Sequence, residues 1–286
     1  MDNLFERIFT SDQFTFFVGK GKKPIVLHAA AIAEQSPALN TLINGGMAEA
    51  KTKSVNFDDV LEEDFIRFCQ FAYMGDYTTP PCIIEENTSG ISEIQPKSPP
   101  PPPPPVALPD TNEIIVEADV GWAFSSPSSK KSKYSKKGIG KLAKLFDDRV
   151  FSSILPRQRI INLCEPISNS DEQEDYTPVF LAHARLYVFA DKYGIESLKS
   201  LSLQKLHKTL KNFTLYRARV GDILKLVQYA YEHTADYGND SLRVIVAEYI
   251  LCEIDTIGKT RKFSDLMEEG GAFVRDFWKL LQQHVL

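Results

Sequence analysis

Apolar and polar positions near the start of the chain follow the spacing of a small sheet. Residues 14–18, Phe-Thr-Phe-Phe-Val, and residues 24–27, Pro-Ile-Val-Leu, are two apolar runs joined by a Gly- and Lys-containing turn, which predicts a β-hairpin. The first run is apolar on nearly both faces, so we expect it to be the central strand. Residues 54–57 predict a short third strand.

Helical spacing begins directly after the hairpin. The Ala-rich residues 28–33 favour a helix, and Ser36 and Pro37 are a typical N-cap and first position for another helix over residues 38–43. A longer helix is predicted to end at Gly75, because four residues before it share one helical face: Phe65, Phe68, Cys69 and Ala72.

From residue 177 onward, the sequence predicts a series of helices. Thr177 and Pro178 are typical of a helix start, and the mostly apolar helix that follows should be buried and end at Gly194. Further helices are expected over residues 195–210, 220–233, 241–254 and 272–286. Their aliphatic and aromatic stripes are typical of a packed core, so we expect a small helical annex.

Composition changes between these two regions. Residues 99–105 are seven consecutive prolines, a run that adopts the polyproline II conformation. The flanking residues contain too little apolar surface to fold, and we expect disorder. The run is either a stiff spacer or a ligand for a proline-binding groove, which Pro99, Pro102 and Pro105 would then contact.

A dense basic segment follows the prolines, and three interpretations of it remain open. It is a solvated linker, a nuclear-import signal or a contact with an anionic surface. The import signal would consist of Lys130, Lys131, Lys133, Lys136 and Lys137. Apolar residues over 139–155 then recur at helical spacing and predict one amphipathic helix, which docks on the folded part or binds a partner groove.

Charge and chemistry exclude several classes of function. The net charge of −5 argues against direct nucleic-acid binding, and no apolar run reaches the ~20 residues of a membrane span, so we expect no membrane partner. Four widely separated cysteines favour a reducing compartment, the cytoplasm and/or the nucleus. Phosphate-loop, nucleophile-elbow and zinc-protease motifs are absent from the sequence, so we expect neither an enzyme nor a cofactor.

Several short motifs occur in an order that resembles the BTB/POZ domain. They are Ser11-Asp12, the hairpin, Leu27-His28, Ser36-Pro37, Met47-Ala48-Glu49 and the run Phe71-Ala72-Tyr73-Met74-Gly75-Asp76-Tyr77. The nearest likeness is to fungal-type members, in which helices follow the domain. The resemblance implies an α+β fold in which helices cap a small sheet of at least three strands.

Residues 183–195 resemble the helix that resumes the BTB fold in fungal-type members. The proline- and lysine-rich segment is then an insertion inside the domain. We expect four parts: the first part of the BTB domain over 1–82, the insert over 83–175, the remaining BTB helices over 176–212 and a helical extension over 213–286.

The segment Met47-Ala48-Glu49 follows two glycines, so we expect it in an exposed loop. In BTB adaptors that recruit the third cullin, this loop carries a hydrophobic-x-Glu motif, which Met47 and Glu49 match. The resemblance therefore implies a non-enzymatic interaction module, in its sharper form a substrate adaptor of a cullin-based ubiquitin ligase with an unknown target. The alternatives are a nuclear scaffold or transcription-associated BTB protein and, from another class, an enzyme with no recognisable motif.

Asp12 and His28 lie at the edges of apolar elements. We interpret them as a buried, hydrogen-bonded structural pair rather than an acid–base pair, and the resemblance implies the same. The resemblance also implies a homodimer through the BTB face. That expectation is weakened because only about ten residues precede the first strand, enough for two helical turns but not for a swapped strand as well.

Overall fold

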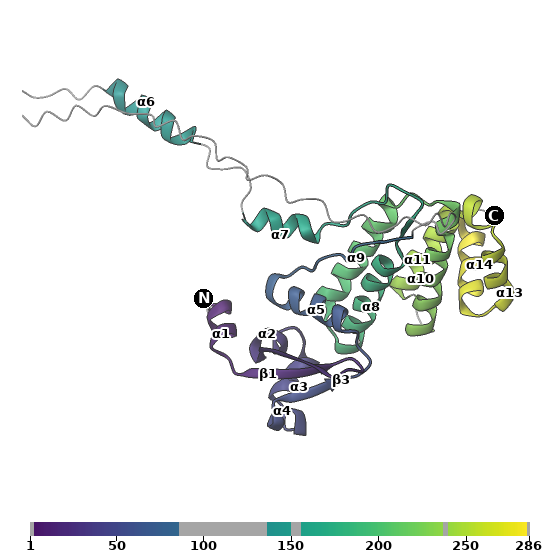
Figure 1. The fold of residues 1–286 in the computed structure, drawn as a ribbon, viewed down its shortest axis with the longest axis horizontal. Helices are drawn as coiled ribbons and strands as arrows, with labels where there is room; N and C mark the ends of the chain where they lie inside the picture. Colours follow the sequence, from purple (N-terminus) through teal and green to yellow (C-terminus); the bar gives the residue numbers. More distant parts are fainter. Residues whose placement is uncertain (1–2, 86–135, 150–155, 237–239, 285–286) are drawn as a thin grey trace, which may run out of the picture. The chain divides into compact units, whose positions relative to one another are not determined.

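The computed structural model describes residues 3–85, 136–149, 156–236 and 240–284. Residues 3–85 and 156–284 belong to one compact unit, whereas residues 136–149 belong to a second unit that is treated by itself. The described residues are mostly helical and include one small three-stranded sheet (Figure 1), so the expectation of a mixed α and β fold is confirmed.

The sheet has the strand order β2-β1-β3. β1 (Gln13–Val18) pairs antiparallel with β2 (Lys23–His28) and parallel with β3 (Ser54–Phe57), so the hairpin and the central place of the first strand are confirmed. Gly19 begins the hairpin turn at φ +70°, a conformation that glycine adopts without strain. Alternate residues of β1 enter the core: Phe14, Phe16 and Val18.

Five helices precede, separate or follow these strands along the sequence. They are α1 (Leu4–Thr10), α2 (Ala29–Ala33), α3 (Pro37–Asn44), α4 (Ala48–Thr52) and α5 (Glu62–Met74). The predicted caps are confirmed: the Ser36 hydroxyl accepts a hydrogen bond from the Leu39 amide at 3.2 Å, and Gly75 ends α5 at φ +74°. The exposed loop expected over residues 47–49 holds for Met47, which is extended, but Ala48 and Glu49 begin α4, because residues 48–52 include strong helix formers.

Eight α-helices and one 3₁₀ turn lie in the part of the unit described after residue 155. They are α7 (Pro156–Cys164), α8 (Thr177–Tyr193), α9 (Glu196–Asn212), η1 (Arg217–Arg219), α10 (Val220–His233), α11 (Ser241–Cys252), α12 (Ile254–Ile257), α13 (Arg261–Glu269) and α14 (Ala272–His284). The sequence patterns do not predict α7 or α13. Thr177 is the first helical residue rather than the N-cap, and its amide donates to Asp175 Oδ1 at 2.8 Å.

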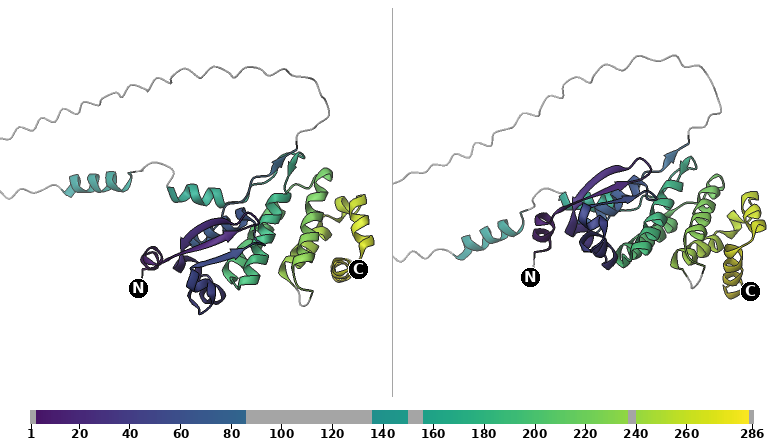
Figure 2. Two further views of the ribbon diagram at one scale, coloured as in Figure 1. Left: turned by 60° about the horizontal axis from the view of Figure 1, so that its bottom comes forward. Right: turned by 90° about the horizontal axis from the view of Figure 1, so that it is seen from below.

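Helix α8 separates two hydrophobic cores. One face, with Leu186 and Phe189, joins the sheet core, where the Phe68 and Phe189 rings lie 4.9 Å apart. Another face, with Phe180, joins the C-terminal helices, where the Phe180 and Phe213 rings lie 5.1 Å apart. Figure 2 shows α8 and α9 between the sheet region and the helices that end the chain. The helix near residue 185 therefore completes the packing of the N-terminal region.

A two-stranded ribbon joins the end of the first part of this unit to a segment that follows Pro156. β4 (Ile83–Ile84) pairs antiparallel with β5 (Glu174–Asp175), and the Glu85 amide donates to the Gln173 carbonyl at 2.9 Å. The predicted proline contacts at Pro99, Pro102 and Pro105 and the lysines at 130, 131 and 133 lie outside the described residues. Lys136 and Lys137 open α6 (Lys136–Asp147), which begins earlier than the amphipathic helix expected from residue 139.

Candidate interaction surfaces

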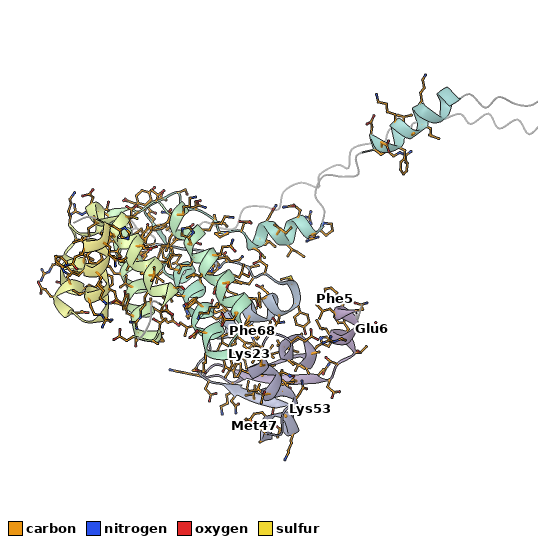
Figure 3. All side chains as sticks on the ribbon, turned by 180° about the vertical axis from the view of Figure 1, so that it is seen from behind. Phe5, Glu6, Lys23, Met47, Lys53 and Phe68 are labelled. Atoms are coloured by element: carbon orange, nitrogen blue, oxygen red, sulfur yellow. The ribbon has the colours of Figure 1, made fainter. Side chains whose placement is uncertain are left out.

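The segment before α4 presents a methionine to solvent. A Cβ atom at Gly45 would lie 2.2 Å from the Thr41 carbonyl oxygen, so the end of α3 requires a glycine there. After Gly46 the chain is extended at Met47, the N-cap of α4, and the Met47 side chain is 59% exposed. Figure 3 shows Met47 at the edge of the N-terminal region, away from the core residue Phe68.

Helix α4 is a surface element that is held at its C-terminal end. None of its five residues, all within the described chain, is buried. The Thr52 hydroxyl donates to the Ala48 carbonyl at 3.1 Å, and Lys53 then adopts a left-handed conformation at φ +50°. The Lys53 carbonyl accepts a hydrogen bond from the Thr15 amide at 2.9 Å, which ties this turn to β1. Met47 and Glu49 are thus presented from a fixed backbone.

Asp12 and His28, both within the described residues, do not bond to each other, so the expected pair is wrong. The Asp12 carboxylate is exposed and lies 2.9 Å from Lys53 Nζ, a contact that lowers the pKa of Asp12. His28 Nδ1 lies 2.9 Å from the Tyr73 hydroxyl. The two segments meet through the backbone instead, where the Ala29 amide donates to the Asp12 carbonyl at 2.8 Å. Each side chain therefore has a structural partner of its own.

A second exposed apolar surface lies on α1. Ile8 is buried and anchors the helix, while the Arg7 guanidinium pairs with Glu34 of the chain after α2. Phe5 and Phe9 stack with ring centroids 6.2 Å apart, and both are more than half exposed. Leu4 and, on β2, Val26 are exposed as well. Large exposed apolar groups of this kind mark contact surfaces.

A groove of about 290 Å³ runs between the start of α5, α8 and α10. Leu61, Phe189 and Tyr229 are among its apolar lining residues. At its base the buried Asp64 carboxylate lies 3.0 Å from Arg67 Nη1 and 3.2 Å from Arg185 Nε. Burial raises the pKa of Asp64 in spite of both arginines. These three side chains join α5 to α8, and the Asp64 carboxylate is paired with both arginines.

A group of polar residues that the sequence patterns do not single out joins the chain after α5 to α8 and α9. Lys205 Nζ lies 2.6 Å from Asp76 Oδ1 and donates to the backbone carbonyls of Tyr77, at 2.9 Å, and Cys164, at 2.5 Å. The Tyr77 hydroxyl lies 2.8 Å from His183 Nδ1. We call Asp76, Tyr77, His183 and Lys205 the buried lock; Tyr77, His183 and Lys205 are buried, and the Asp76 side chain is 40% exposed. A single polar residue in an apolar helical stripe, as at His183, was the one available signal.

Burial sets the protonation state of the lock. His183 is fully buried, and desolvation, with the positive charges of Lys205 and Arg67, lowers the pKa of its imidazole to about 3. The Lys205 ammonium also lies 4.7 Å from the centroid of the Tyr77 ring, a cation–π distance. The imidazole is therefore neutral near pH 7. These groups face one another rather than a cavity, so their role is structural.

Other contacts fix the ribbon to the C-terminal helices. The Asn169 side-chain amide donates to the Thr214 carbonyl at 2.8 Å and accepts from the Thr214 amide at 2.7 Å. The Tyr176 amide donates to Asp222 Oδ2 at 3.0 Å, and burial raises the pKa of Asp222 to about 6. These hydrogen bonds attach the chain on both sides of β5 to the C-terminal helical region.

Two other kinds of feature are not found in the described residues, a metal site and a membrane-spanning helix. Across residues 3–85, 136–149, 156–236 and 240–284, no three His, Cys, Asp or Glu side chains gather as a metal site. In the same ranges no helix combines the length and the apolar character needed to cross a bilayer. No family model and no curated protein matches the chain.

Proposed function

We propose that this chain is a non-enzymatic protein-interaction module of the BTB/POZ type. The order hairpin, short helices, third strand and longer helix supports this, because the resemblance implies the same order, although the structure has a third short helix, α4, before β3. The packing of α8 on the sheet core also supports it, since residues 183–195 carry the second part of the resemblance. The insert between them then belongs to the same domain.

We propose further that the module is a substrate adaptor of a cullin-based ubiquitin ligase. The observation that carries this proposal is the exposed Met47 at the N-cap of a surface helix, followed by Glu49 in the first turn of that helix. Methionine is a flexible apolar group that fills irregular pockets, and a neighbouring carboxylate adds directional contacts. Together they match the hydrophobic-x-Glu pattern expected of cullin-binding BTB proteins.

The exposed side of α1 supports a second contact of the same module. We infer that Phe5 and Phe9, with Leu4 and Val26, form the face of a homodimer, the assembly that the resemblance implies. This surface and Met47 occupy different places on the N-terminal region, as the labels in Figure 3 show. A dimer through α1 therefore leaves the α4 surface accessible to a cullin.

Binding of the purified third cullin to the full chain tests the adaptor proposal. We expect the Met47→Ala/Glu49→Ala variant to bind at least about tenfold more weakly than the original chain, as expected when an interface anchor is truncated. The matched control is Met74→Ala/Glu172→Ala, which removes an exposed methionine and an exposed glutamate elsewhere and should bind normally. Equal binding by both variants would remove Met47 and Glu49 from the interface, and no binding by the original chain would overturn the adaptor proposal.

A further inference from the structure

Helix α6 separates apolar and basic side chains onto opposite sides. At 3.6 residues per turn, Leu142, Leu145 and Phe146 fall on one side of the helix, Lys144 lies roughly opposite them, and Lys141 lies at the border of the apolar side. The three large apolar side chains are 67%, 66% and 72% exposed. They form a continuous apolar face on α6 itself.

A helix of this length is marginal in water without a surface to pack on. Isolated helices shorter than ~12–15 residues are seldom stable, and α6 also contains Gly138 and Gly140, which disfavour a helix. Exposed Leu and Phe side chains add a driving force for burial. The sequence therefore encodes a helix that is stabilised by contact with something else.

The charges of α6 indicate what that surface is. The helix carries four lysines against one aspartate, although the whole chain has a net charge of −5. A Lys-rich polar side opposite Leu and Phe, with low average hydrophobicity, is typical of helices that lie in the plane of a bilayer surface. Ala143 widens the apolar face to nearly half the circumference, which suits a plane better than the narrow stripe used between paired helices.

We propose that α6 binds the surface of a bilayer that contains anionic phospholipids. The helix lies parallel to the membrane, with Leu142, Leu145 and Phe146 in the acyl boundary and the lysine ammonium groups at the phosphates. The lysine stems can lie along the apolar boundary while their charges stay in water. This would bring the interaction module to a membrane, which goes beyond the adaptor proposal. The expectation of no membrane partner concerned spanning segments, and a helix on the surface needs none.

Co-sedimentation of the full chain with vesicles tests this proposal. We expect the chain to sediment with phosphatidylcholine–phosphatidylserine vesicles, to bind at least tenfold more weakly to phosphatidylcholine alone, and to be released by salt. Leu142→Glu/Phe146→Glu should abolish binding. Lys141→Gln/Lys144→Gln should weaken it by roughly thirtyfold, since each lysine near the surface contributes about fivefold.

The control is Leu163→Glu/Ile167→Glu, which adds the same two negative charges at exposed apolar positions outside α6 and should bind like the original chain. Equal binding to both vesicle types, no binding to either, or the same loss in the control and in Leu142→Glu/Phe146→Glu would each overturn the proposal. Capture of a DNA duplex in place of vesicles, unaffected by Leu142→Glu/Phe146→Glu, would also overturn it and assign α6 to nucleic acid. None of these outcomes depends on cullin binding through Met47.

Discussion

The buried lock and the surfaces of α1 and α4 differ in where they place their side chains: polar groups are buried in the lock, and large apolar groups are exposed on the two helices. In the lock, Lys205 and His183 are buried and their polar atoms have partners within the chain. On α1 and α4, Phe9 and Met47 lie in water, although apolar groups of their size gain free energy from burial. We therefore expect the lock to contribute to stability and the outer helices to carry the proposed contacts. The predictions below test whether these two properties can be changed separately.

The largest effect is expected from breaking the lock. Lys205→Ala leaves the Asp76 carboxylate and the Tyr77 and Cys164 carbonyls without their shared donor, so we expect the free energy of unfolding to fall by about 3 kcal/mol. Urea denaturation measures it. The control Lys208→Ala removes only an exposed pair with Glu165 and should cost less than about 1 kcal/mol. Equal effects of the two variants would show that the lock contributes no special stability.

The pH dependence of the free energy of unfolding should show the effect of the lowered pKa of His183. Its folded pKa of about 3 lies below the ordinary value of 6.5, so its stabilising contribution is complete above pH 6.5 and is lost as the pH falls toward 3. Between pH 7 and pH 5 the loss is about 2 kcal/mol. Asp222, with a raised pKa of about 6, acts in the opposite direction because its burial favours the protonated form at low pH.

The two contributions can be separated by substitution. Asp222→Asn should unmask the acid loss caused by His183, and His183→Phe should make the remaining protein more stable at pH 5 than at pH 7. Asp64, whose pKa is also raised, supports the same direction in the second variant. Urea unfolding across this pH range measures both slopes. An unchanged slope after His183→Phe would contradict the assignment of a buried neutral imidazole.

The smallest effect on stability is expected on α1. Phe5→Glu/Phe9→Glu replaces two exposed rings, so the free energy of unfolding of the monomer should change by less than about 0.5 kcal/mol per site. The same variant should convert a dimer to a monomer, because it places charge in the proposed interface. Light scattering after size-exclusion chromatography measures this mass. A monomeric original chain, or a variant that remains dimeric, would remove α1 from the homodimer proposal.

Elements with strong local signals could be predicted from the sequence. Ser36 with Pro37, Gly75 and Gly194 set helix ends through contacts within a few residues, and each does so in the structure. The β1–β2 hairpin and β3 were predictable for the same reason. Ala48 and Glu49 were expected in a loop because they follow Gly45 and Gly46, whereas the helix-forming residues 48–52 fold as α4.

Features that depend on distant residues were not predictable in this way. Asp12 and His28 have different partners because Lys53 and Tyr73 reach them from elements much later in the chain. The β4–β5 ribbon consists of two-residue strands, too short for any periodic pattern. Lys205 resembles any other helical lysine until α9 places it beside Asp76 and Cys164. Identifying these groups requires the tertiary arrangement.

The β4–β5 ribbon affects how freely the sequence between its two strands can change during evolution. Because Glu85 and Gln173 are joined by a backbone hydrogen bond, the stretch between them begins and ends at the same point of the folded unit. The entropy of closing such a loop grows only with the logarithm of its length, so doubling it costs roughly 0.6 kcal/mol. Changes in length before Pro156, which leave Cys164 and Asn169 in place, are therefore expected to be nearly neutral for folding, and natural selection can remodel that part of the stretch without disturbing the folded unit.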